Sequence, residues 1–124
     1  MSTKKVLLIG WNPESVDYSR YPGMNADMLR AALEGDLQKL NDIGYDAHMG
    51  YITSEAAAVK EVQDILSKNT FDIILIGAGV RKDDSCFLLF EKLVNVVHEY
   101  AVNAKICFNT GPTDNVEAVQ RWDI

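Results

Sequence analysis

The sequence predicts an α/β fold, a three-layer α/β/α sandwich around a four-stranded parallel sheet of order 2-1-3-4, of the flavodoxin-like or Rossmann-like type. Short apolar runs alternate with segments of helical periodicity along the whole chain. The first and third runs, 5–9 and 71–76, are almost continuously apolar and each is followed by glycine. Such runs are typical of strands that are buried on both faces of a parallel sheet.

The other two strands are expected at the edges of the sheet. Residues 46–52 and 104–109 alternate between apolar and polar side chains, which indicates one wetter face. Right-handed crossovers then pair the first strand with the third and place the alternating strands outermost. In this arrangement the first and last helices cover one face of the sheet, and the second and third helices cover the other.

The first helix is predicted from an apolar stripe, followed by Gly44 as a C-terminal stop. Gly35 inside this helix costs roughly 1 kcal/mol relative to alanine. Thr53 or Ser54 is expected to cap the second helix. The residues of the stripe recur at helical spacing: Leu29, Leu33, Leu37 and Leu40.

The third helix, opened by residues 83–85, is apolar around more than one face, and residues 114–121 form the fourth helix. A helix of this kind is usually buried on two sides, which suggests a homodimer that packs through the third helix or the fourth strand. The alternative is burial under its own neighbours, including Trp122. The apolar residues concerned are Phe87, Leu88, Leu89, Phe90, Leu93, Val94, Val96 and Val97.

The length, charge and composition of the chain exclude several classes of partner. Its 124 residues predict one domain, 1–124, that folds without metal or disulfide staples. With 12 basic against 18 acidic residues, the net charge of −6 argues against nucleic-acid or anionic-membrane partners. The apolar runs are too short to span a bilayer, and residues 10–12 end the first run well short of a signal-peptide core. Cytoplasmic localisation is therefore expected.

Cys86 and Cys107 have no CxxC spacing and are expected to be reduced thiols. Cys86 lies near the start of the third helix, where a helix N-terminus lowers the pKa of a thiol, so it is the better candidate for a reactive thiolate. The histidines, His48 and His98, share no metal-ligand spacing with other candidate ligands, so no metal is expected. No pattern identifies a cofactor.

Ligands of such sheets bind beyond the carboxyl ends of the strands, at the switch point between the first and third strands. The first loop at this edge, 10–24, exceeds the usual length of about 2–6 residues and carries large aromatic side chains. We expect it to form a lid with Asn12 at its base. The alternative is an ordered surface loop whose aromatic residues, Trp11, Tyr18 and Tyr21, plug the end of the sheet.

The best local motif of the chain is the loop 77–85. Gly77 and Gly79 allow close backbone approach to a ligand, and the Arg81 guanidinium matches a carboxylate or phosphate. The alternative is a tight turn with Arg81 solvated or paired to a neighbouring aspartate. Three further polar residues are expected to orient the ligand from adjacent loops: Thr53, Asn109 and Thr110.

Several enzyme classes do not fit these loops. A phosphate-accepting receiver needs acidic residues where Trp11, Asn12 and Gly77 stand. A phosphatase with a cysteine after the first strand is excluded because no cysteine precedes Cys86, and no G-x-S-x-G elbow is present. Whether the protein is an enzyme is left open.

Several segments together resemble a family of small bacterial α/β proteins of unassigned function. The resemblance runs over most of the chain and implies a self-contained protein, but it implies no activity, cofactor or catalytic residue. At the level of fold alone the chain is similar to flavodoxin-like domains. The segments that carry the resemblance are Pro22–Met24, Ile76–Arg81, Phe90–His98, Cys107–Thr110 and Glu117–Trp122.

Two functional hypotheses follow from the sequence. The first is a small cytosolic protein that binds a small anionic ligand at the carboxyl edge of the sheet, held by the backbone of residues 77–79 and by Arg81. The second is a non-catalytic, homo-oligomeric interaction or regulatory module that uses the third helix. A minor possibility is redox sensing through Cys86.

Overall fold

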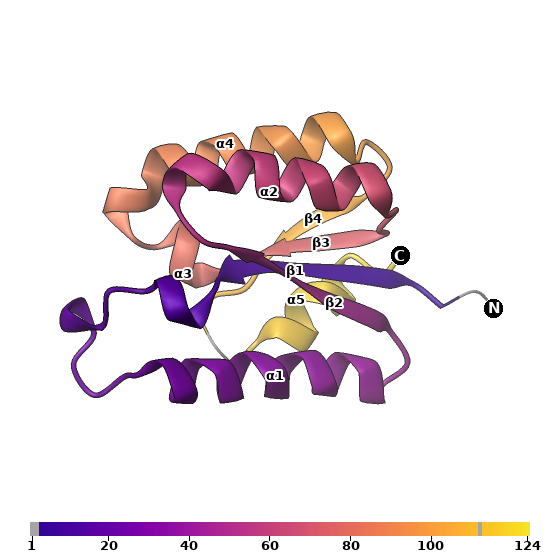
Figure 1. Ribbon diagram of the computed structural model, residues 1–124. Helices are drawn as coiled ribbons and strands as arrows, with labels where there is room; N and C mark the ends of the chain where they lie inside the picture. The colour runs from indigo at the N-terminus through magenta and orange to yellow at the C-terminus, as the bar shows by residue number, and fades with distance from the viewer. Residues whose placement is uncertain (1–2, 112) are drawn as a thin grey trace.

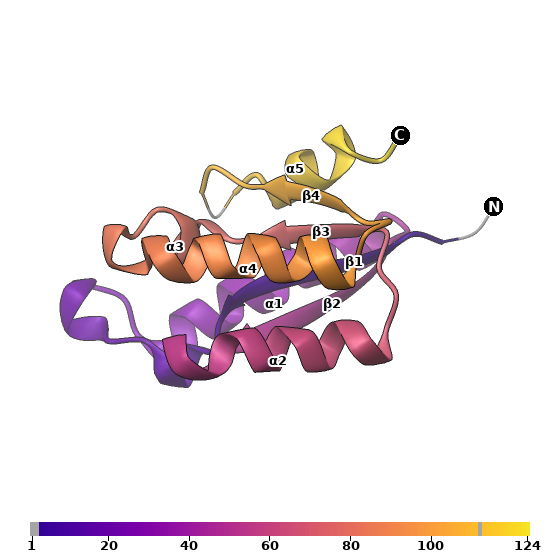
Figure 2. The same ribbon diagram turned by 90° about the horizontal axis from the view of Figure 1, so that it is seen from above.

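The computed structural model describes residues 3–111 and 113–124. Its strands form one parallel sheet in the order β2-β1-β3-β4, with β2 and β4 at the edges (Figure 2). The predicted strand order and flavodoxin-like topology are confirmed. The strands are β1 (Lys5–Trp11), β2 (Asp46–Ile52), β3 (Ile73–Ile76) and β4 (Lys105–Phe108).

Helices cover both faces of the sheet, as predicted. Helices α1 (Ala26–Asp42) and α5 (Asn115–Arg121) lie on one face, and α2 (Glu55–Lys68) and α4 (Phe87–Tyr100) lie on the other (Figure 1). No helix in the described ranges is long and apolar enough to cross a membrane. The short helical elements are η1 (Pro13–Ser15), η2 (Tyr18–Arg20), α3 (Ala78–Arg81) and η3 (Asp84–Cys86).

The two central strands supply a core on each side of the sheet because successive side chains of a strand point to opposite faces. In β1, Leu7 and Ile9 pack with α2 and α4, whereas Val6 and Leu8 pack with α1 and α5. Cys107 of β4 is buried in the second cluster. Both cysteines are free, as expected.

Local sequence signals set the helix boundaries. The Ser54 hydroxyl accepts a hydrogen bond from the backbone N–H of Ala57 at 3.0 Å, so Ser54 rather than Thr53 caps α2. Helix α1 ends at Asp42, and Gly44 beyond it adopts a φ of +110°, a conformation that favours glycine.

Helix α4 corresponds to the predicted third helix, and its own chain covers most of its apolar surface. Leu89, Leu93 and Val97 are fully buried against the sheet and α2. Phe87 and Leu88 at its first turn remain 63% and 58% exposed. Burial under its own neighbours, the alternative given above, therefore accounts for most of the apolar character, and the homodimer stays a prediction. Trp122, which was expected among those neighbours, is 41% exposed after α5 on the other face of the sheet, so that part of the alternative is wrong.

Candidate functional site

The apolar stripe of α1 divides into two halves. Leu40 is fully buried and Leu37 packs against the core, but Leu29 and Leu33 are only partly covered. These two leucines face the carboxyl half of the sheet across a cavity of about 280 Å³. The N-terminal half of α1 thus presents apolar side chains to a space that the core does not fill.

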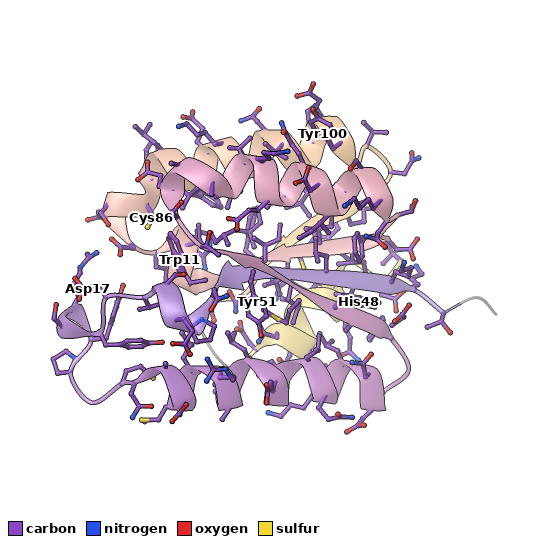
Figure 3. All side chains as sticks on the ribbon, viewed as in Figure 1. Trp11, Asp17, His48, Tyr51, Cys86 and Tyr100 are labelled. Atoms are coloured by element: carbon purple, nitrogen blue, oxygen red, sulfur yellow. The ribbon has the colours of Figure 1, made fainter. Side chains whose placement is uncertain are left out.

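The cavity lies at the carboxyl edge of the sheet, where β1 and β3 end, and this is the predicted switch point. Leu8 and Leu75 form its floor, and Trp11 closes it at the end of β1. Figure 3 shows Trp11 beside the start of α3, and a Cβ atom at Gly79 would lie 3.9 Å from the Trp11 ring. The walls are thus mainly apolar, and the volume is just below the usual range of small-molecule pockets, about 300–1,000 Å³.

Two buried amides form the polar end of the cavity. Asn109 and Asn115 are 6% and 7% exposed, and the Asn109 Nδ2 group donates to Asn115 Oδ1 at 2.6 Å. The buried Asn109 Oδ1 atom accepts no hydrogen bond from the residues that the structure describes. It is an acceptor that polar groups of a ligand can satisfy.

A carboxylate completes the polar end. Asp36 of α1 lines the cavity, and burial raises its pKa above the ordinary value. Lys39 and a hydrogen bond from the Asn115 side chain act in the opposite direction. Asp36 is the charged residue among those that line this cavity.

The loop between β1 and α1 contributes Tyr18, Tyr21 and Met24 to the cavity lining, a position that both the lid hypothesis and its alternative, a loop that plugs the end of the sheet, expect. The Tyr18 hydroxyl donates to the Pro13 carbonyl at 2.7 Å and shapes the loop from within. These contacts show the covering position of the loop, while opening and closing stay a prediction.

Asp83 fastens this loop to the segment after α3. It accepts from the Tyr21 hydroxyl at 3.2 Å and from the Arg20 guanidinium at 3.3 Å. Hydrogen bonds from Ser85, together with Tyr21 and Arg20, lower the pKa of Asp83 to about 2. The aspartate is therefore an ionised anchor for the loop at neutral pH.

The glycine segment differs from its prediction. Residues 78–81 form a one-turn helix, α3, and the Val80 and Arg81 N–H groups donate to the Gly77 carbonyl at 3.1 Å each. Of the backbone N–H groups of residues 77–79 that were expected to hold a ligand, that of Gly77 donates to the Ile9 carbonyl at 3.0 Å. Gly77 is packed tightly, because an added Cβ atom would lie 3.2 Å from the Ile9 carbonyl oxygen.

Arg81 is partly buried, does not line the cavity, and forms no ion pair with an aspartate among the described residues. Its Nη2 group donates to the backbone carbonyl of Asn109, and its guanidinium lies 5.9 Å from the centre of the Phe108 ring. Arg81 consequently holds the backbone of Asn109 from outside the cavity. Lys82 similarly donates to the Thr110 carbonyl.

The other predicted ligand residues have partners within the chain. The Asn12 side chain accepts from the Glu14 N–H at 3.0 Å and caps η1, and the Thr53 hydroxyl donates to Glu61 at 2.8 Å. The Thr110 hydroxyl donates to Asp114 at 2.7 Å. These three residues, like Arg81, are absent from the cavity lining, which contains Gly77, Gly79 and Asn109.

Sequence reasoning missed Asp36 and Asn115. Asp36 lies seven and three positions after Leu29 and Leu33, so a carboxylate on the apolar stripe of α1 was a visible signal. Asn115 lies at the start of the predicted last helix, 114–121, and carries no such signal. Only the fold brings it beside Asn109.

The structure does not favour Cys86 as a thiolate. Burial raises the pKa of its thiol, and the charge of Asp83 acts in the same direction. Burial raises the pKa of Cys107 to about 12. Within the described residues, no group of three His, Cys, Asp or Glu side chains is arranged to hold a metal ion.

In comparisons with known proteins, the sequence matches no family model and no curated protein. The resemblance to a bacterial family therefore stays a prediction, and what the structure establishes is an α/β fold of flavodoxin-like topology.

Proposed function

We propose that this protein binds a small, largely apolar molecule in the cavity at the carboxyl edge of its sheet. The observation that carries the proposal is the half-covered pair Leu29 and Leu33, which face an apolar space of about 280 Å³ with a buried, unpartnered acceptor on Asn109 at its end. Apolar walls with a few convergent polar groups are the usual composition of a ligand site. The cavity supports binding and specifies no reaction.

The chemistry of the cavity shifts the expected ligand away from an anion. Its lining contains Asp36 and no lysine or arginine, so an anionic ligand would meet like charge without a compensating cation. The anion hypothesis keeps one supporting observation, the buried Arg81 Nε group, which donates to no described residue. An anion there would bind beside Phe108, outside the cavity.

Native mass spectrometry of freshly purified protein, compared with a denatured spectrum, tests the proposal directly. A copurified mass that is lost on denaturation identifies the ligand class. Titration with ethylbenzene tests the cavity itself, followed by NMR of the side-chain methyl groups of Leu29 and Leu33. Shifts at these methyls are expected, and their absence up to the solubility limit of the probe contradicts an accessible apolar site.

A blocking variant gives the matched control. Gly79→Leu places a side chain toward Trp11 at the cavity mouth, so it is expected to weaken ethylbenzene binding at least tenfold. Gly35→Leu makes the same change on α1, where an added Cβ atom meets open space, and is expected to bind normally. Equal binding by both variants places the probe elsewhere on the protein.

The interaction module is the second candidate, because Phe87 and Leu88 are exposed apolar side chains at the start of α4. Sedimentation velocity decides whether the chain self-associates. Leu88→Asp is the suitable variant, whereas Val96 is 8% exposed and belongs to the core, so a charge there would unfold the protein. A dimer that Leu88→Asp dissociates supports this function, and a monomeric wild-type protein contradicts its homo-oligomeric form.

A further inference from the structure

We infer that the cavity selects ligands that carry a nitrogen hydrogen-bond donor, and cationic amines above all, because Asp36, Asn115 and Asn109 present an acceptor of fixed orientation. This inference rests on the proposed function and names the ligand class for that site. It does not use Arg81 as a ligand group. Three observations carry it: the direction of the hydrogen bond between the two amides, the burial of the Asn109 acceptor and the charge of the cavity lining.

The hydrogen bond between the two amides defines their orientation. The Asn115 Oδ1 atom accepts from Asn109 Nδ2 at 2.6 Å, so the Nδ2 group of Asn115 is left as the donor of that side chain. Asp36 lines the same cavity, and an ionised carboxylate, which only accepts hydrogen bonds, matches this orientation of both amides.

The orientation of the two amides leaves Asn109 with an acceptor that is unpaired within the described part of the chain. Asn109 lines the cavity, and because its Nδ2 group is directed to Asn115, its Oδ1 atom is the group left without a donor among the described residues. Asn109 is only 6% exposed, and a buried acceptor without a donor is costly. An N–H or O–H group of a ligand can supply the missing hydrogen bond, whereas a carboxylate or an ether cannot. The negative charge of the lining then favours a cationic amine among these donors.

The backbone of the acceptor is held in place from the opposite side. Arg81 donates to the Asn109 carbonyl, and Arg121 donates to the carbonyl of Phe108 at 2.8 Å. Arg81 is thus a positioning residue for Asn109. A fixed acceptor loses little conformational entropy on binding, which favours selectivity.

The lining also favours positive charge. Asp36 is its charged residue, and Trp11, Tyr18 and Tyr21 supply aromatic rings that attract cations. An ammonium group attached to an apolar body matches this combination. A carboxylate on the same body meets repulsion from Asp36 and an acceptor to which it cannot donate.

Three probes that share a phenylethyl body test the inference at pH 7: 2-phenylethylamine, ethylbenzene and 3-phenylpropionate. Dissociation constants come from NMR titration of the methyl groups of Leu29 and Leu33. We expect the amine to bind at least tenfold more tightly than ethylbenzene, and the carboxylate to bind most weakly. Equal affinities, or tighter binding of the carboxylate, overturn the inference while ethylbenzene binding leaves the proposed function standing. Binding by none of the probes contradicts both.

Two variants test the roles of the Asp36 charge and of the Asn109 acceptor. Asp36→Asn keeps the shape but removes the charge, so the preference for the amine over ethylbenzene is expected to fall at least tenfold. Asn109→Leu removes the acceptor and is expected to abolish the preference while ethylbenzene still binds. If Asn109→Leu does not fold, Asp36→Asn alone decides.

Asp42→Asn is the matched control, because Asp42 lies on the same helix outside the cavity and accepts from Gln38. It is expected to keep the full preference. If Asp36→Asn and Asp42→Asn both still bind 2-phenylethylamine more tightly than ethylbenzene by the wild-type factor, the role given to Asp36 is overturned.

Discussion

A buried amide pair is an uncommon way to end an apolar cavity. Asn109 and Asn115 are both almost fully buried, and one hydrogen bond joins them. Each amide has more donors and acceptors than this bond uses, and burial makes unsatisfied groups expensive. The burial of both amides among apolar neighbours supports a role in recognition.

Removing one member of the pair tests its contribution to stability. Asn115→Ala leaves the buried Nδ2 group of Asn109 without its acceptor, so the free energy of unfolding is expected to fall by about 1–3 kcal/mol. Urea denaturation monitored by circular dichroism measures the change. Asn95→Ala, on the exposed side of α4, is the control, and its change is expected to stay within about 0.5 kcal/mol. Equal stability of the two variants would show that the buried pair adds nothing.

Asp83 gives a prediction about pH. Its folded pKa of about 2 lies below the ordinary value of 3.8, so its carboxylate stabilises the folded protein fully above 3.8 and loses this effect as the pH falls through about 2. Asp83→Asn is therefore expected to be less stable than the wild type at pH 5. The difference should shrink between pH 4 and about 2. Urea denaturation at a series of pH values measures it.

The control for this experiment is Asp84→Asn, at the adjacent residue. The Asp84 carboxylate accepts no hydrogen bond from the described residues, so this variant is expected to follow the wild-type curve. A pH-independent difference between Asp83→Asn and the wild type would contradict the ionised anchor.

At the scale of elements, α1 combines a core-packing half with a cavity-facing half. Its C-terminal half is held by Leu40 and Leu37, while Leu29 and Leu33 face the cavity. The N-terminal half therefore depends on its cap, where the Asn25 side chain accepts from the Met28 N–H at 2.9 Å. Such a helix is sensitive to intrinsic helix propensity at exposed positions.

Gly35 and Gly44 test that sensitivity with the same substitution. Gly35→Ala lies inside the helix, and its added Cβ atom meets open space, so we expect a gain in stability of roughly 0.5–1 kcal/mol. Gly44→Ala forces alanine into a φ of +110° and is expected to lower stability. Thermal unfolding measures whether stability rises in Gly35→Ala and falls in Gly44→Ala. A loss of stability in Gly35→Ala would indicate a role for this glycine that helix propensity does not describe.

At the scale of the whole molecule, the two faces of the sheet are packed differently. Helices α2 and α4, of 14 residues each, pack on one face. On the other face α5 has only 7 residues. The cavity lies on this second face beside α1, and the loop between β1 and α1 lines it together with the helix.

Adjacent residues of β3 compare the two faces. Ile74 is buried in the packed cluster, whereas Leu75 belongs to the opposite cluster and reaches the cavity. Ile74→Ala is expected to cost about 2–5 kcal/mol of unfolding free energy. Leu75→Ala is expected to cost less, because its side chain already borders open space and loses fewer contacts. Chemical denaturation measures both, and a greater loss in Leu75→Ala would contradict the difference between the faces.

The sequence by itself determined the architecture. Continuous apolar runs distinguish the central strands from the alternating edge strands, and the helical segments of the sequence correspond to α1, α2, α4 and the shorter α5. These signals are local, because the pattern of apolar and polar residues along a strand reflects whether one or both of its faces are buried. The general position of a site at the carboxyl edge followed from the topology.

The tertiary structure alone decided which side chains meet there. Arg81 was expected at a ligand because nothing in its local sequence reveals the Asn109 carbonyl that it contacts. Asp36 and Asn115 lie far apart in the sequence, and the packing of α5 beside α1 brings them together at the cavity. A hydrogen-bond partner depends on three-dimensional approach between distant segments, and periodicity along the chain carries no information about it.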